Sequence, residues 1–559
     1  SDLLSDPSGN KIDNFYVPAL SSNISYGRKI DGAFGSGYFD VPTPGKSNNT
    51  SKYYALNLEK PDFSVPAGFY PDTVELVMAH PVSGVTIHYT LDGSEPTLNS
   101  PVYTSPLKLT NRSADPNGIS TIPTNPGLNF PYYTFDTSKA NSRGWLPPYG
   151  NVQKVNVVRA KAFAGNAIAS ETKTRTYIVD SLLNERYKFP VLSLSTDAAN
   201  LFSPDSGIYV YGNPRPNDSD FDGDYSYSGP EWTIPLYMEY FNEDGSLGFA
   251  RYTSGEMNGN GGRHAPQKSF RLFKTGMDGV SNFEYKFFDD KEISVFEKLL
   301  LRNGGHRPDC FPRDNLADKI CDGLNMEVPN YKMVVVFING EYWGLQCIKE
   351  RFDHDYFQHN FNIKNEDFCM LELKGNLTEG NPGDEQPYLN LLDFVSTNDM
   401  SQQANYDYVK TQMDIENYIT FQVSEMYIGN GDWPNNNTRF WRKKTADYEP
   451  DAAYGLDGRW RWVLYDLDGG FGGSCPNVTP SFNSIKRATN TDPLYVNYTI
   501  LLRNLLNNAS FKTDLLNRYA DLLNSSYSSS VVAAKIIDEK NRLATDIMEH
   551  VNRWRYPST

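Results

Sequence analysis

The sequence predicts a multidomain protein in which an all-β sandwich is followed by a domain of mixed α+β type. Three observations lead to this fold class. A chain of 559 residues is too long for one ordinary hydrophobic core. Residues 55–182 hold short alternating polar and apolar runs separated by turns, which is typical of a sandwich. Residues 183–559 instead mix helical periodicity with hairpin signals, so we place a domain boundary near residue 183.

The composition is typical of a folded, water-soluble protein. Hydrophobic residues make up 39% of the chain and aromatic residues 14%. The formal net charge of −16 argues against nucleic acid as the main partner, because phosphate backbones are bound by Lys and Arg. No apolar run is long enough for a transmembrane segment, and Met333–Ile338 predicts a buried strand.

The chain begins with Ser1 and not with Met. We therefore expect a processed chain, from which an export signal or a membrane anchor has been removed. The chain holds five cysteines without a CxxC pair, which favours free buried thiols over a disulfide framework or a zinc site. They are Cys310, Cys321, Cys347, Cys369 and Cys475.

Two accessory segments precede residue 183. Within residues 1–50, "ISYGRKIDGAFGSGYFDVPTPGKSN" resembles the closing strands of a lamin-tail domain, and an irregular N-terminal arm is the alternative. The stretch "YTLDGSEPT" contains an Asp-Gly turn between two strands. Together with the following "SPVYTSPLKL" it resembles the β-sandwich found at the C-terminus of chitobiases and hexosaminidases, where the module is an accessory or a spacer.

The second domain is predicted element by element. "EWTIPLYMEYFNEDGSLGF" indicates strand, turn and strand, and Arg313–Leu324 places three apolar residues on one helical face. "KMVVVFINGEYWGLQCIKERFD" predicts a hairpin, because Asn339-Gly340 is a strong two-residue turn signal. Residues 414–427 predict a helix with one apolar face, and the tail from "NYTILLRNLL" onward is helical.

The stretch "IGNGDWPNNNTRFW" carries the strongest chemical signal. Its Asp, Asn, Gly and Pro content also fits a plain turn. However, Asp432 is followed five residues later by Asn437, then by two strand-like runs, the second of which ends in Asp466 and Asp468. Protein kinases use this order, because a hydroxyl that attacks a γ-phosphate needs an acceptor beside it and Mg²⁺ needs oxygen ligands at fixed positions.

Four ordered motifs carry a family resemblance: "RNGGHRPDCFPRDNLADKI", "VVVFINGEYWGLQCIKERFD", "NGDWPNNNTRFW" and "WRWVLYDLDGGFG". They resemble the CotH-type atypical protein kinases, the spore coat protein H family, over residues 185–555. The resemblance implies a diverged protein-kinase fold and transfer of phosphate from ATP. It also implies that Asp432 is the catalytic aspartate, with Asn437 and either Asp466 or Asp468 as metal ligands.

In "NGNGGRHAPQKSF", Arg263 and Lys268 match the basic positions that would face the triphosphate. The glycine run lacks GxGxxG spacing, and a lysine on an alternating strand is often solvated, so a structural role is the alternative for Lys268. Glu350 would pair with Lys268, contact the nucleotide, or form an ordinary surface ion pair.

These patterns predict an ATP-dependent kinase that uses Mg²⁺ or Mn²⁺ and phosphorylates Ser or Thr of an unidentified protein substrate. The location expected is the periplasm or surface of a bacterium. The alternatives are a binding or scaffold protein that keeps the fold without catalysis, and a glycan-handling protein. The acidic stretch "NDSDFDGDYS" resembles the start of a calcium loop, but it lacks the closing glutamate, so a plain surface loop is favoured.

Overall fold

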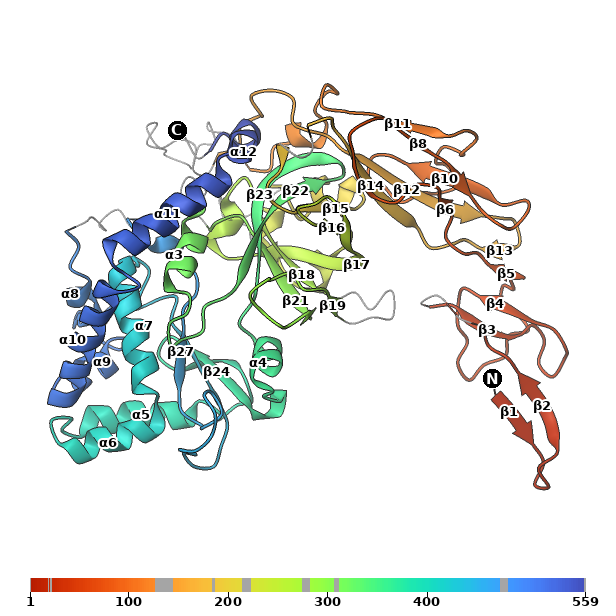
Figure 1. The fold of residues 1–559 in the computed structure, drawn as a ribbon. Coiled ribbons are helices and arrows are strands. Elements are labelled where there is room, and N and C mark those ends of the chain that lie inside the picture. Colours follow the sequence, from red (N-terminus) through yellow and green to blue (C-terminus); the bar gives the residue numbers. More distant parts are fainter. Residues whose placement is uncertain are drawn as a thin grey trace.

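The computed structural model describes residues 2–18, 20, 23–125, 144–182, 186–213, 223–273, 282–305, 311–472 and 481–556. Figure 1 shows an arch that runs from two small hairpins through a sandwich to a central barrel, and ends in a helical part. The fold class predicted from the sequence is therefore confirmed. The hairpins pair β1 (Asp2–Ser5) with β2 (Lys11–Phe15), and β3 (Ser25–Arg28) with β4 (Ser36–Phe39).

The sandwich is built from short strands. Its four-stranded sheet has the order β10-β12-β14-β7 and lies beside the two-stranded sheets β11-β8, β13-β5 and β6-β9. Val74 and Leu76 are buried while Glu75 between them is exposed, as the period of two requires. The elements are β5 (Leu56–Asn57), β6 (Asp62–Phe63), β7 (Gly68–Tyr70), β8 (Val74–Leu76), β9 (Met78–Ala79), β10 (Thr86–Thr90), β11 (Leu107–Leu109), η1 (Ile119–Thr121), β12 (Asn156–Phe163), β13 (Ala167–Ile168) and β14 (Lys173–Val179).

The second part begins with a closed barrel of order β15-β16-β17-β18-β21-β23-β22, in which β15 closes the ring by pairing parallel with β22. The predicted hairpin is present, and Asn339 and Gly340 at its turn both have positive φ. The elements are β15 (Val191–Ser195), α2 (Ala198–Phe202), η3 (Asp224–Ser226), η4 (Pro230–Trp232), β16 (Ile234–Phe241), β17 (Leu247–Asn258), η5 (Gly261–His264), β18 (Ser269–Phe273), β19 (Phe283–Glu284), β20 (Val295–Phe296), β21 (Lys298–Arg302), α3 (Arg313–Cys321), β22 (Tyr331–Ile338) and β23 (Glu341–Lys349).

The helical part surrounds a small sheet of order β25-β24-β26-β27. Its central helix α7 is capped by Asp414 and ended by Gly429 in the left-handed conformation. The elements are α4 (His354–Phe361), η7 (Asn365–Asp367), β24 (Phe368–Glu372), β25 (Asn376–Glu379), α5 (Gln386–Thr397), α6 (Gln403–Gln412), α7 (Ile415–Ile428), β26 (Arg439–Lys443), β27 (Arg461–Val463), η8 (Leu467–Gly469), α8 (Ser484–Ala488), α9 (Ile500–Leu505), α10 (Ala509–Asn524), α11 (Ser529–Leu543) and α12 (Ile547–Trp554).

Helix α7 differs from the prediction of one apolar face, because it is buried around nearly its whole circumference. It lies between strand β27 and helices α8 and α10, which cover it from several sides. Trp460 and Trp462 belong to the same hydrophobic cluster as the buried residues of α7. Because α7 is packed on several sides, it holds the start of the loop that follows it in a fixed position.

The sandwich and the barrel are joined by backbone pairing and by one carboxylate. Tyr342 N–H donates to the Gln153 carbonyl over 2.8 Å, and Val155 N–H donates to the Gly340 carbonyl over 2.8 Å. The Glu341 carboxylate accepts N–H groups at Gly118 and Ser120, over 2.5 and 2.9 Å. The accessory module is therefore packed against the barrel. The boundaries predicted at residues 55 and 183, and the lamin-tail assignment of residues 1–50, stay predictions.

Candidate active site

The loop after α7 is held by its own backbone and by a buried tryptophan. Asp432 N–H donates to the Asn430 side chain over 3.1 Å, and Trp433 is only 2% exposed. Pro434 is also buried, and the Arg487 guanidinium donates to the Trp433 carbonyl over 2.5 Å. Burying the indole fixes the loop, because exposing it to water would cost free energy. Trp433 and Pro434 therefore support the loop from the protein interior.

This loop lies directly against the segment that contains Asp466 and Asp468. Gly431 N–H donates to the Gly469 carbonyl over 3.1 Å, and the Asp432 carboxyl carbon lies 3.6 Å from the position a Cβ would take on Gly469. The Asn437 amide donates to the Asp466 carbonyl over 3.1 Å. The structure therefore brings together the four residues Asp432, Asn437, Asp466 and Asp468, which belong to two separate segments of the sequence.

The structure adds an ion-pair network that the sequence analysis missed. Arg302, the last residue of β21, contacts Asp466 over 2.7 Å and Asp314 over 3.1 Å. Asp314, in the first turn of α3, also accepts from the Leu467 N–H over 2.9 Å. Lys349, the last residue of β23, contacts Asp314 over 2.9 Å. Barrel, helix α3 and the Asp466 segment are thus tied together at one point.

The glycines of "RNGG" bring the backbone close to Asp468. Gly305 has φ of 103°, and a Cβ there would overlap the Asp468 carboxylate. Asn303 accepts from the Gly305 N–H over 3.1 Å and donates to the Gln267 carbonyl over 2.5 Å. Asn303 therefore links the end of the glycine-rich turn between β17 and β18 to the turn that contacts the acidic segment.

Burial and neighbouring charges set the protonation of this network. The Asp466 side chain is 34% exposed, and its partial burial raises its pKa, as do Asp468 and Asp314, while Arg302 opposes this. Burial also disfavours the charged form of Asp314, but Arg302 and Lys349 outweigh it and hold its pKa below the ordinary value. Arg302 has its pKa held well above the usual range by Asp314, Asp466 and Asp468, despite its burial. The network therefore keeps its cations charged.

A family model described as "CotH kinase protein" matches residues 256–559, which is more than half of the chain. The chain belongs to the CotH kinase family. A second model, "Chitobiase/beta-hexosaminidase C-terminal domain", matches residues 65–129 within the sandwich. The resemblances to these two families noted in the sequence are therefore confirmed. A search of curated proteins gave no match.

The predicted phosphate-facing lysine of this CotH-family chain is fully buried. Lys268 donates to the carbonyls of Arg263 and Ala265, each over 2.9 Å, and to the side chain of Asn125. Its ammonium also lies 3.8 Å from the ring centre of Tyr225. Burial lowers the pKa of Lys268 well below its ordinary value. A contact with the triphosphate stays a prediction, and it would require this amine to leave its present partners.

The other two predicted nucleotide residues also have protein partners. Arg263 donates to the carbonyls of Ser226 and Tyr227, over 2.7 and 3.1 Å. Glu350 pairs with Lys291 over 2.8 Å, and not with Lys268 as one alternative proposed. The nucleotide role of both residues is untested.

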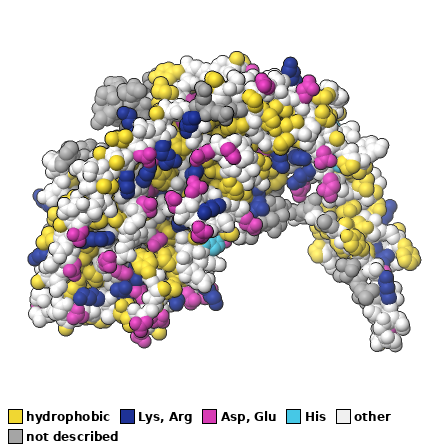
Figure 2. Space-filling model, viewed as in Figure 1, with side chains coloured by type: hydrophobic (Ala, Val, Ile, Leu, Met, Phe, Trp, Pro, Cys, Tyr) yellow, Lys and Arg dark blue, Asp and Glu magenta, His cyan; other side chains and the backbone are white. Residues whose placement is uncertain are grey.

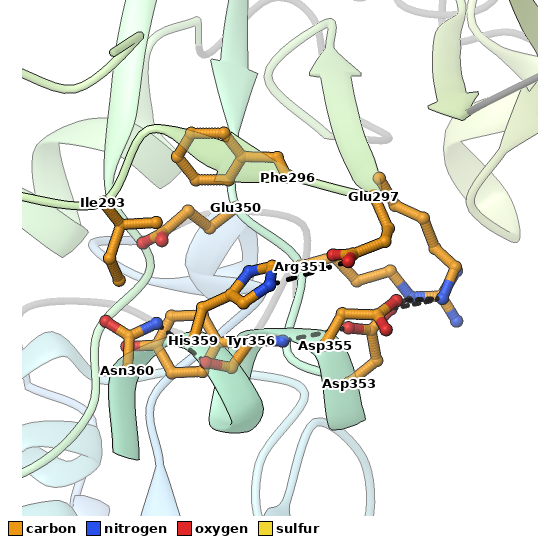
Figure 3. Close-up of a pocket in the computed structure, with 11 residues that line it drawn as sticks. Ile293, Phe296, Glu297, Glu350, Arg351, Asp353, Asp355, Tyr356, His359 and Asn360 are labelled. Carbon is orange, nitrogen blue, oxygen red and sulfur yellow. Dashed lines mark hydrogen bonds and ion pairs between the residues drawn. The ribbon is translucent and has the colours of Figure 1, made fainter. Parts of the chain in front are cut away.

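Glu350 lies at the junction of the barrel and the helical part. Figure 3 shows it with Tyr356 and Asn360 of α4 below and Phe296 of β20 above, around a narrow crevice. This crevice has room of only about 20 Å³. None of the four residues Asp432, Asn437, Asp466 and Asp468 lines it, so it is separate from the candidate active site.

Among the described residues, no three His, Cys, Asp or Glu side chains are grouped so that they could hold a metal ion on their own. A magnesium nucleotide site needs fewer, since Mg²⁺ is commonly held by one or two carboxylates together with substrate phosphates. The oxygen atoms of Asn437, Asp466 and Asp468 suit such a hard cation. None of the helices in the described ranges has the length and apolar character needed to cross a membrane.

Cys321, Cys347 and Cys369 are free and buried, as expected. Cys310 and Cys475 lie outside the described residues, as do Asp218, Asp220 and Asp222 of the acidic stretch. Figure 2 shows Lys and Arg side chains interspersed with Asp and Glu over the helical part and the barrel, on the face in view.

Proposed function

We propose that this CotH-family protein is an ATP-dependent kinase that phosphorylates Ser or Thr hydroxyls of a protein substrate. The observation that carries the proposal is the contact between the Asp432 loop and the segment from Asp466 to Asp468, beside the largely buried Arg302. Phosphoryl transfer depends mainly on positioning and on charge stabilisation, and these residues lie on fixed supports.

Each residue has a specific proposed role. Asp432 accepts the proton of the attacking hydroxyl, because its carboxylate lies near the start of a loop that the buried Trp433 and the Gly431–Gly469 hydrogen bond hold in place. The Asn437 Nδ2 donates to the Asp466 carbonyl, so its Oδ1 is the atom that would bind a metal ion, together with a carboxylate of Asp466 or Asp468. These residues would hold Mg²⁺ or Mn²⁺, which would supply positive charge to stabilise the transferred phosphate.

Arg302 also supports the kinase proposal. Protein kinases need a cation on a strand paired with a carboxylate on the following helix. Arg302 and Asp314 have this relation, since β21 precedes α3 along the chain and the two side chains are in contact over 3.1 Å. We propose that Arg302 contacts the phosphate groups of the nucleotide, and that the ion pair with Asp314 orients the Arg302 side chain for this contact.

The test is incubation of the purified chain with labelled ATP and Mg²⁺ or Mn²⁺. The wild-type protein is expected to bind ATP and to transfer phosphate to itself or to added protein. Asp432→Asn should keep ATP binding and lose transfer by about 10²-fold or more, because the hydroxyl loses its acceptor. Asp393→Asn, an exposed acid on α5, is the matched control and should leave transfer unchanged.

Absence of both ATP binding and phosphate transfer in the wild-type protein would favour the alternative, a surface binding or scaffold protein that keeps the fold. The convergence of the four site residues favours the kinase over that alternative. We also propose an extracytoplasmic location in a bacterium, based on the accessory sandwich. Fractionation of cells that make the full-length protein would test it, and recovery in the cytoplasm would contradict it.

A further inference from the structure

The glycine-rich turn between β17 and β18 belongs to neither strand. The two strands pair as far as Asn258 and Ser269, and residues 259–268 between them include only the short η5. Arg263 and Lys268, which are predicted to face the triphosphate, lie in this turn. Because neither a strand ladder nor a long helix pairs the buried backbone groups of the turn, these groups need other hydrogen bonds.

Lys268 supplies part of these hydrogen bonds from within the turn. Its ammonium group donates to the carbonyls of Arg263 and Ala265, each over 2.9 Å, and to the Asn125 Oδ1. An ammonium group has three N–H donors, so these three partners use all of them. Lys268 therefore supports the turn internally and also connects it to the accessory sandwich.

The remaining contacts come from residues 118–125 of the sandwich, which we call the strap. Thr124 Oγ1 donates to the Pro266 carbonyl over 2.8 Å. Asn125 Nδ2 donates to the His264 carbonyl over 2.5 Å. Both strap side chains are buried. Together with the two carbonyls that accept from the lysine, four consecutive carbonyls of the turn are bound by side chains, and half of these bonds come from the strap.

The start of the strap is anchored on the barrel. The Glu341 carboxylate, in β23, accepts from the N–H groups of Gly118 and Ser120, over 2.5 and 2.9 Å. Ser120 is fully buried. The strap is therefore fixed to a barrel strand at its start and bound to the glycine-rich turn at its end, so it restrains where the turn can lie.

The turn is in contact with the candidate active site at its other end. The Gln267 carbonyl accepts from the Asn303 side chain over 2.5 Å, and Asn303 Oδ1 accepts from the Gly305 N–H over 3.1 Å. Gly305 in turn lies against the Asp468 carboxylate. A change in the conformation of the turn would therefore reach the acidic segment through Asn303.

We propose that the strap is a positioning element for nucleotide binding, with Thr124 and Asn125 as its positioning residues. Neither residue is expected to touch the nucleotide. They hold the glycine-rich turn in one conformation before the nucleotide binds, and a turn that is already ordered lowers the entropic cost of binding. The role in nucleotide binding rests on the proposed kinase function, whereas the restraint of the turn does not.

The restraint is tested by hydrogen–deuterium exchange of the full chain without nucleotide. Asn125→Ala and Thr124→Val should each speed deuterium uptake in residues 259–268, where the amides of Arg263 and Ala265 are hydrogen-bonded within the turn. Thr124→Ser keeps the hydroxyl and should restore wild-type uptake. Asn111→Ala is the control in the same sandwich, because Asn111 is exposed and its side chain accepts only from the nearby Ser113. Uptake equal to wild-type in both Asn125→Ala and Thr124→Val would overturn the proposal.

The nucleotide role is tested by calorimetric titration with MgATP and by phosphate transfer. Asn125→Ala and Thr124→Val should each weaken MgATP binding by about 3-fold to 10-fold, the effect of one lost hydrogen bond. The kcat at saturating ATP should stay within about twofold of wild-type, because Asp432 is unchanged. Unchanged or tighter MgATP binding in both variants would overturn the role in positioning. If the wild-type protein binds no ATP, the kinase function and the nucleotide role both fail, while deuterium uptake still decides whether the strap holds the turn.

Discussion

Arg302→Met tests whether the ion-pair network holds the candidate active site together. Methionine keeps most of the aliphatic volume and removes the guanidinium. Breaking a buried ion pair from one side usually costs about 3–5 kcal/mol, because a charge is left without compensation. In this variant Asp314 would keep its ion pair with Lys349 and its hydrogen bond from the Leu467 N–H, each over 2.9 Å. The Asp466 side chain is 34% exposed, so water can replace part of its lost contact. We therefore expect a loss of about 2–3 kcal/mol, below the usual range.

The assay is urea unfolding followed by tryptophan fluorescence, because Trp433, Trp460 and Trp462 all lie in the cluster beside this network. Lys410→Met is the control, since Lys410 pairs with Asp407 on an exposed face of α6 and should cost less than about 1 kcal/mol. Arg302→Met should also weaken MgATP binding. A stability loss no larger than that of the control, with ATP binding unchanged, would refute the reasoning.

Three further predictions follow from single contacts. Alanine at a positive φ typically costs about 1 kcal/mol of stability. Gly305→Ala should cost more than this in thermal unfolding, because its Cβ would also overlap the Asp468 carboxylate. Gly383→Ala is the control for the backbone effect, because Gly383 has a φ of 102° and open space around it. Glu341→Ala should loosen the sandwich from the barrel and raise the rate of limited proteolysis near residue 118, whereas equal cleavage of wild-type and variant protein would contradict this. Burial raises the pKa of Asp318 to about 8 despite the neighbouring Lys349. The folded protein therefore holds this proton more tightly than the unfolded chain does, and it loses stability as the pH rises from about 4 to 8. The unfolding midpoint should fall less between pH 5 and pH 8 in Asp318→Asn than in the wild-type protein.

The local parts of the candidate site could be predicted from the sequence. Asp432, Asn437 and Asp466 lie in loops and Asp468 in the short 3₁₀ helix η8, and the turn residues and strands that flank them are encoded within a few residues. The turn at Asn339-Gly340 is of the same kind, because Asn and Gly are the residues that most readily adopt positive φ. The order of helix, loop, strands and acidic segment therefore follows from short-range patterns in the sequence.

Only the tertiary structure determines which charged and polar side chains contact one another. Arg302 and Asp466 are 164 residues apart, and Lys268 and Asn125 are 143 apart. The sequence pattern placed Lys268 on an alternating strand, whereas it directly precedes β18, and periodicity cannot show that Asn125, from the loop that follows η1, contacts its amine. The same limit explains α7, whose composition predicts an apolar face but not the neighbours that bury the rest of it. Sequence patterns report local geometry, whereas burial and ion pairing depend on the distant segments that the fold brings opposite one another.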